Sequence, residues 1–306
     1  MEMATLGRTG LKVSRLGIGL VEIGLQLTED EVDLAGRLLN IALDGGVNFF
    51  DTAECYGISE DLIGATIAHR REEFILATKA GHPSFGTEAP RFTGDTVRKS
   101  LERSLKRLRT DYVDVLQIHA YDIFGEPPDD VVEAVIDAKK QGKTRFIGYS
   151  QENNEAVWAI ESGLFDTLQT SFHIMDQKAR YDIFQKATDE NMGIIAKRPV
   201  GNAMWGRTFR PEDHYENTVA RRLGQRAEKM QAAGPIPGEP TDRIETALGF
   251  VLAHPQIHTA IVGTRNPDHM QSNIDIVNDR PGLDAAVVQE LHQRYDNVGA
   301  DWLSID

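Results

Sequence analysis

The chain has 306 residues, of which 41% are hydrophobic and 26% charged, a composition typical of a folded globular protein. Its formal net charge of −14 repels the phosphates of nucleic acids and anionic membranes, so neither is expected as a partner. A single cysteine excludes an intrachain disulfide, and no stretch resembles a signal peptide or reaches the ~18 apolar residues of a membrane span, so a cytoplasmic protein is expected.

Apolar and amphipathic segments alternate along the chain. Residues 11–20 predict a hairpin followed by an apolar strand, and helical periodicity begins at Glu29. Thr28 and Glu31 have the spacing of a capping box at the start of this helix, and Asp44-Gly45-Gly46 ends it. Further apolar runs predict strands buried on both faces at 47–53, 73–79, 113–119, 145–150, 167–172, 193–199 and 259–264.

Amphipathic segments separate these predicted strands. They lie at 95–108, 129–142, 154–163, 178–191, 243–255 and 267–277. Eight strands alternating with helices predict parallel βαβ units that close into a barrel. We therefore expect an α/β fold, a single (β/α)8 TIM barrel over residues 1–306, with an N-terminal hairpin and a long loop after strand seven.

The long loop is a polar, Gly- and Pro-containing insertion at about 201–240, with a possible helix near 216–231. In a barrel it would lie on the C-terminal face, where binding loops are found. The main competing fold is an open doubly wound sheet, because Gly17-Ile18-Gly19 resembles the start of a dinucleotide fingerprint. The third glycine position holds Glu22, and we expect no helix directly after this turn, so the barrel is favoured.

Three consecutive strand ends carry ionisable side chains. Asp51 ends the second strand, Tyr56 follows in its loop, Lys79 ends the third strand and His119 ends the fourth. Because the C-terminal ends of barrel strands form the functional face, these side chains are expected to meet. Cys55 lies among them, but no histidine lies nearby in sequence to activate it as a nucleophile.

These residue types favour proton transfer to a carbonyl oxygen. A nearby ammonium lowers the pKa of a tyrosine hydroxyl from about 10, and Lys79 can be that cation for Tyr56. Asp51 can keep Lys79 charged, and His119 can donate a hydrogen bond to a substrate oxygen. Taken singly, each residue could have a purely structural role: the Asp–Lys pair as a salt bridge, the histidine as a structural side chain and the tyrosine in packing. Their conjunction favours catalysis.

A metal-dependent barrel hydrolase or isomerase is an alternative class. It would need several ligands converging on one ion, yet the first strand has no His-x-His pair. Lys79 beside Asp51 would also compete with a cation. We expect no metal.

The segments FFDTAECYG, ILATK and LQIH resemble the signatures of the aldo-keto reductase family, and the resemblance runs through AIVGTRNPDHMQSN, nearly the whole chain. It implies an NAD(P)H-dependent barrel enzyme that reduces an aldehyde or ketone to an alcohol. Asp51, Tyr56, Lys79 and His119 match the family's catalytic tetrad, in which Tyr56 would protonate the carbonyl oxygen as hydride reaches carbon.

The resemblance also implies how a nicotinamide would be held. Ser150 and Gln169 match the family's contacts to the amide, and Gln151 stands at the position of an asparagine. Lys197 stands where the family usually has a stacking aromatic residue. We hypothesise that Lys197 or Arg198 repels the oxidised, cationic nicotinamide and so favours the reduced cofactor. The turn implied in phosphate binding comprises Pro199, Val200, Gly201 and Asn202.

The segment after strand eight is implied in binding the adenosine end of the cofactor. Asn266 and Pro267 predict an N-cap and first residue of a helix, whose N-terminus can receive a phosphate. Arg265 favours NADP(H), whereas the family's usual arginine is replaced by His269, which leaves NAD(H) possible. The implied residues are Gly263, Thr264, Arg265, His269 and Asn273.

The substrate pocket is expected between the first four loops and the insertion. Candidate residues are Val21, Glu22, His82, Phe85, Tyr121, Trp205 and Phe209. Trp205 and Phe209 could cover the substrate or merely anchor the insertion. The same residues would also suit a dehydrogenase oxidising a sugar or alcohol, or a nucleotide-binding regulatory subunit. The sequence names no particular substrate and leaves the oligomeric state open.

Overall fold

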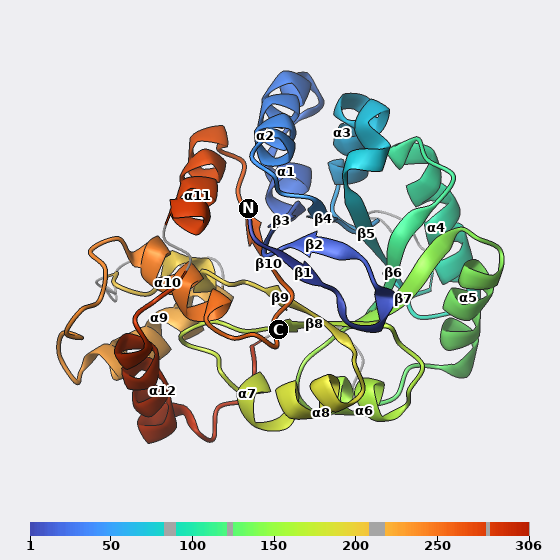
Figure 1. The fold of residues 1–306 in the computed structure, drawn as a ribbon. Helices are drawn as coiled ribbons and strands as arrows, with labels where there is room; N and C mark the ends of the chain where they lie inside the picture. Colours follow the sequence, from blue (N-terminus) through green and yellow to red (C-terminus); the bar gives the residue numbers. More distant parts are fainter. Residues whose placement is uncertain (83–89, 121–124, 208–217, 280–281, 306) are drawn as a thin grey trace.

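The computed structural model describes residues 1–82, 90–120, 125–207, 218–279 and 282–305. Eight parallel strands close into a barrel in the order β10-β3-β4-β5-β6-β7-β8-β9, with helices around it (Figure 1). The strands are β3 (Leu16–Gly19), β4 (Phe49–Asp51), β5 (Ile75–Ala80), β6 (Val113–His119), β7 (Thr144–Ser150), β8 (Thr167–Ser171), β9 (Gly193–Lys197) and β10 (Thr259–Gly263). The predicted (β/α)8 barrel is confirmed.

The predicted N-terminal hairpin is also confirmed. Strands β1 (Met3–Thr5) and β2 (Lys12–Ser14) pair antiparallel and lie across the barrel in Figure 1. Apolar hairpin residues pack into one buried cluster with inward-facing strand residues. The cluster comprises Leu6, Leu11, Val13, Phe49, Ile75, Ala77, Val115, Ile195 and Ile261. The hairpin therefore closes the N-terminal end of the barrel and leaves the C-terminal end for a site.

The helices pack their apolar faces on the outside of the barrel, where a second, larger buried cluster lies. They are α1 (Val21–Gln26), α2 (Val32–Asp44), α3 (Ser59–Thr66), α4 (Gly94–Leu108), α5 (Asp129–Lys140), α6 (Asn153–Glu161), α7 (Ala179–Asp182), α8 (Phe184–Asp189), α9 (Thr218–Gln231), α10 (Arg243–Leu252), α11 (Pro267–Asp279) and α12 (Ala285–Gly299). The helix expected within the insertion is α9.

Two local expectations are wrong. Helix α1 begins directly after β3, where we expected no helix, although Glu22 still occupies the third glycine position of the fingerprint. The helix expected at 178–191 is interrupted at Ile183, whose backbone departs from helical geometry at φ −111°, so α7 and α8 are separate. The predicted capping box is confirmed: the Thr28 amide donates to the Glu31 carboxylate at 3.0 Å, although a 3-10 turn precedes α2.

Candidate active site

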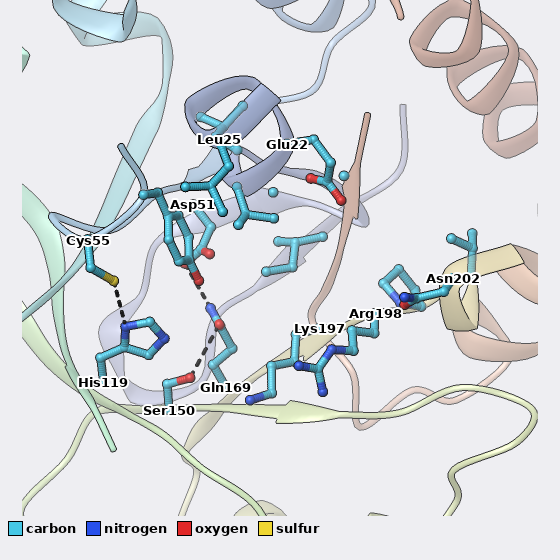
Figure 2. Close-up of a pocket in the computed structure, with 18 of the residues that line it drawn as sticks. Glu22, Leu25, Asp51, Cys55, His119, Ser150, Gln169, Lys197, Arg198 and Asn202 are labelled. Atoms are coloured by element: carbon cyan, nitrogen blue, oxygen red, sulfur yellow. Dashed lines mark hydrogen bonds between the residues drawn. The ribbon is translucent and has the colours of Figure 1, made fainter. Parts of the chain in front are cut away.

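The C-terminal end of the barrel opens into a cavity of about 660 Å³ (Figure 2). Asp51, His119, Ser150, Gln169 and Lys197 reach it from five different strands. It is lined by Gly19, Leu20, Val21, Glu22, Leu25, Asp51, Cys55, Tyr56, His119, Ser150, Gln169, Lys197, Arg198, Pro199, Val200, Asn202, Ala203, Ile261 and Gly263. The predicted gathering of strand-end side chains is thus present in the structure.

A buried ion pair lies at the base of the cavity. The Lys79 ammonium is 2.5 Å from Asp51 Oδ2 and also donates to the Thr52 carbonyl at 2.9 Å. The other Asp51 oxygen accepts hydrogen bonds from Gln117 Nε2 at 2.9 Å and Gln169 Nε2 at 2.8 Å. Both charged groups are therefore compensated despite being almost fully buried, which a stable buried pair requires.

Gln117 was not predicted as a site residue. It lies two positions before His119 on β6, so both side chains point to the same side of the strand. This alternation of side chains along the strand is the sequence signal that could have identified Gln117 as a site residue. Its side-chain amide donates to Asp51 Oδ1. Gln169, predicted as a nicotinamide contact, donates to the same oxygen.

Tyr56 lies above this ion pair. The Lys79 ammonium is 4.8 Å from the centre of the Tyr56 ring, which is an attractive cation–π distance. Burial, and secondly the Asp51 carboxylate, raise the pKa of the Tyr56 phenol, while the charges of Lys197 and Arg198 lower it. The expectation that the pKa of Tyr56 falls below its usual value is therefore wrong, because burial and Asp51 outweigh the cations. The phenol is neutral and carries its proton.

His119 is a neutral imidazole at the same wall. Burial, and then the Lys79 charge, hold its pKa well below the usual 6.5. Its Nδ1 lies 3.5 Å from Cys55 Sγ, and its ring meets the Tyr56 ring edge-on at 5.7 Å between centres. Burial raises the pKa of the Cys55 thiol to about 11, so it stays protonated and is not a nucleophile at neutral pH.

Close backbone packing fixes the loop that carries Tyr56. Gly24 of α1 lies so near that an added Cβ would be 1.9 Å from the Tyr56 carbonyl. Gly57 has φ +53°, a left-handed conformation that glycine adopts without steric cost. The Glu54 carboxylate, which is fully buried, accepts from Arg103 Nε at 2.9 Å. Both ends of the Tyr56 loop are therefore tied to the surrounding helices.

Glu60 adds a buried carboxyl behind this loop. It accepts from the Thr78 hydroxyl at 2.7 Å, and burial raises its pKa from 4.5 to about 7. The native state then holds a proton that the unfolded chain releases, so stability falls as pH rises from 4.5 to 7. As the pH rises from 5 to 8, wild type is expected to lose about 2 kcal/mol of unfolding free energy that Glu60→Gln does not lose. Urea unfolding at both pH values measures this; a constant difference would contradict the raised pKa.

The residues implied in holding a nicotinamide divide into two groups. Ser150 and Gln169 line the cavity and lie 3.4 Å apart, hydroxyl to amide oxygen. Gln151 does not line it, since its amide donates to the Ala120 carbonyl at 2.6 Å and accepts from the Glu152 amide at 2.8 Å. The expected contact from Gln151 to a ligand is therefore not visible in this cavity.

The turn after β9 forms a cationic wall. Lys197, Arg198, Pro199, Val200 and Asn202 all line the cavity, whereas Gly201 lies behind them. Lys197 Nζ is 2.9 Å from the carboxylate of Glu152, which is 1% exposed. Arg198 Nη1 instead donates to the Ile305 carbonyl at 2.5 Å, a neutral acceptor.

Of the residues predicted at the end of β10 and after it, only Gly263, the last residue of the strand, lines the cavity. The Asn266 side chain accepts from the Asp268 amide at 2.9 Å, so the predicted N-cap of α11 is confirmed. Arg265 and His269 are exposed near this helix start, while Thr264 and Asn273 are buried. The helix N-terminus is thus open to solvent with a cation beside it.

Only some of the residues predicted for the substrate pocket line the cavity. Val21 and Glu22 line the cavity, and burial raises the pKa of the Glu22 carboxyl. His82 lies behind, edge-on to His119 at 5.5 Å between ring centres. Trp205 is buried outside the cavity and donates to Glu239 at 2.6 Å, so it anchors the insertion. Phe85, Tyr121 and Phe209 lie outside the described residues.

Cavity residues that the sequence did not indicate are Gly19, Leu20, Leu25, Cys55, Ala203 and Ile261.

In the described ranges, no set of three or more His, Cys, Asp or Glu side chains is grouped so that it could hold a metal ion. None of the helices in those ranges combines the length and apolar character needed to span a bilayer.

The fold agrees with the known proteins that this chain resembles. The model of the Aldo/keto reductase family matches residues 15–296, so the chain belongs to that family. It is 31% identical over 330 residues to an uncharacterized oxidoreductase of Bacillus subtilis, YrpG, covering 98% of each protein. It is 28% identical to L-galactose dehydrogenase of Arabidopsis thaliana, covering 95% of this chain and 93% of that protein. The holo form of an aldo-keto reductase from Bacillus halodurans matches with a TM-score of 0.79 at 25% identity, over 96% of each chain.

Proposed function

We propose that the chain is an NAD(P)H-dependent reductase that converts a small aldehyde or ketone to an alcohol, with Tyr56 as general acid. The observation that most supports this proposal is the contact between the Tyr56 and His119 rings beside the buried Asp51–Lys79 pair, at the open end of the barrel. Membership of the aldo/keto reductase family supports the same reaction class.

The residues fit the proton chemistry of carbonyl reduction. A neutral His119 donates a hydrogen bond to the carbonyl oxygen without bringing a charge. A protonated Tyr56 gives its proton to that oxygen as negative charge develops there, and Lys79 stabilises the charge left on the phenol. Asp51 keeps Lys79 charged and fixed. A bound nicotinamide would supply the hydride.

The cavity also fits a dinucleotide. Ser150 and Gln169 offer polar groups for an amide, and Lys197 and Arg198 place cations beside the 198–202 turn. The Glu152 carboxylate neutralises Lys197, so repulsion of the oxidised nicotinamide would require the Arg198 guanidinium to lie at the ring and not at the phosphates. Titration with both cofactor forms tests this bias, and equal dissociation constants would remove it. The other residues proposed to hold the cofactor are Pro199, Val200, Gly201, Asn202, Gly263, Thr264, Arg265, His269 and Asn273.

We expect NADPH to be preferred over NADH because of Arg265. Its exposed guanidinium at the N-terminus of α11 suits the additional phosphate of NADPH. Arg265→Ala is expected to raise KM for NADPH about tenfold and leave KM for NADH within about twofold. Steady-state kinetics with both cofactors measures this. Arg98→Ala on α4, where the side chain is 51% exposed, is the matched control. A wild-type kcat/KM that strongly favours NADH would contradict the preference.

Oxidation of a sugar or alcohol is the second candidate, favoured by the similarity to L-galactose dehydrogenase. The decisive experiment follows absorbance at the reduced-nicotinamide band, in both directions, across a panel of aldehydes, ketones, sugars and alcohols. Turnover with carbonyl substrates supports the proposed reductase. Faster turnover in the oxidative direction supports the dehydrogenase. Tight cofactor binding with no turnover would favour a regulatory subunit.

A further inference from the structure

Residues 303–305, called here the 303–305 segment, lie against the loops at the C-terminal end of the barrel. Leu303 is 63% exposed, whereas Ser304 and Ile305 are buried. Side chains from four separate places in the fold hold this segment. They are Asn153 at the start of α6, Asp176 after β8, Arg198 after β9 and Arg226 in α9.

Ile305 is held on both sides of its backbone. Its amide donates to Asp176 Oδ2 at 3.0 Å, and its carbonyl accepts from Arg198 Nη1 at 2.5 Å. The Ser304 hydroxyl donates to the other Asp176 oxygen at 2.9 Å. Asp176 is fully buried, so it is a fixed anchor, and Ile305 transmits its position to Arg198.

The 303–305 segment is also anchored independently of Arg198. Arg226 donates to the Leu303 carbonyl at 2.6 Å, and its guanidinium lies 4.8 Å from the centre of the Trp302 ring. The Ser304 amide donates to Asn153 Oδ1 at 3.0 Å. The segment is therefore a fixed support against which the Arg198 side chain rests.

Arg198 is placed as an anion-binding group. It is partly buried, lines the cavity and has φ +55°, a left-handed conformation that is costly for a residue with a Cβ. Its hydrogen bond to Ile305 goes to a neutral carbonyl, so its charge is not cancelled there, unlike that of Lys197 beside Glu152. A guanidinium held in one orientation suits the paired oxygens of a phosphate.

We propose that the 303–305 segment is a latch that positions Arg198 to bind the pyrophosphate of the dinucleotide, with Asp176 as its anchor. The inference rests on the proposed function, since it requires a nicotinamide nucleotide in this cavity. Figure 2 shows Arg198 beside Lys197 and toward Asn202, on the side of the cavity away from Cys55 and His119. This position favours the cofactor's phosphates over an anionic group on the substrate.

A double-mutant cycle tests whether the latch acts through Arg198. Ile305→Pro removes the amide that Asp176 holds, and it is expected to raise the Kd of NADPH about tenfold. Ile305→Ala keeps that amide and is the matched control, with a smaller expected rise of at most about threefold. In an Arg198→Met background, Ile305→Pro is expected to change the Kd by less than about twofold. Fluorescence titration without substrate measures each value.

A second ligand separates pyrophosphate binding from binding of the adenosine end. Adenosine 2′-monophosphate lacks both phosphates of the pyrophosphate, so its Kd is expected to stay the same in every variant. Should Ile305→Pro fail to fold in a thermal unfolding assay, Ser304→Ala replaces it in the cycle, with an expected rise of about threefold.

The outcomes distinguish the latch from the proposed function. Equal effects of the Ile305 or Ser304 substitution in both backgrounds would overturn the latch, as would an Arg198→Met variant that binds NADPH normally. An anionic carbonyl substrate whose KM rises in Arg198→Met, with an unchanged NADPH Kd, would assign Arg198 to the substrate instead. Wild-type protein that binds neither NADPH nor NADH would refute the proposed function itself, and the latch with it.

Discussion

Tyr56→Phe is expected to lower kcat for carbonyl reduction by about 10²- to 10⁴-fold while leaving the Kd of NADPH within about twofold. The substitution removes only the hydroxyl that would give its proton to the carbonyl oxygen. The raised pKa of this phenol means that wild type carries the proton across the neutral pH range. Steady-state kinetics gives kcat, and fluorescence titration gives the Kd.

The structure offers a matched control for this experiment. Tyr149 lies on β7, is fully buried and does not line the cavity. Tyr149→Phe is expected to leave kcat within about twofold, because its hydroxyl is remote from the proposed proton transfer. A Tyr56→Phe enzyme that turns over carbonyls as fast as wild type would remove Tyr56 from the role of general acid.

The barrel and its strand ends were predictable because their signals are local. Each buried parallel strand is a short apolar run, and the first polar residue after it marks the C-terminal face. Asp51, Lys79 and His119 could be placed in this way before their partners were known. Their closeness then follows from the barrel register, in which Asp51 pairs with Ala77 on β5 and Lys79 pairs with Gln117 on β6.

Other features depend on contacts between distant residues and leave little trace in the sequence. The support of Arg198 by Ile305 joins positions 107 residues apart, and neither residue indicates the other. The pKa of Tyr56 was expected to fall because Lys79 was considered without burial. In the structure, desolvation and the Asp51 carboxylate together decide the direction. Charge arguments from sequence therefore predict which groups meet, but not which effect dominates.

Lys79→Met is expected to destabilise the protein by about 3 kcal/mol at pH 7, because it leaves the buried Asp51 carboxylate without its cation. The amides of Gln117 and Gln169 still donate to that carboxylate, so the loss should fall at the lower end of the range for broken buried pairs. Asp51→Asn should also destabilise the protein, since the buried Lys79 would be left with only a carbonyl and a neutral amide as partners.

The double variant Asp51→Asn with Lys79→Met shows whether the pair acts as a unit. It contains no unpaired buried charge, so it is expected to be more stable than the sum of the two single losses by about 2 kcal/mol. Urea unfolding of all four proteins gives this coupling, and additive losses would contradict it. All three variants should reduce carbonyls slowly, because each lacks either the cation beside the Tyr56 ring or the carboxylate that fixes it. If the double variant regains stability but stays inactive, the effect of the ion pair on folding is separate from its role in proton transfer.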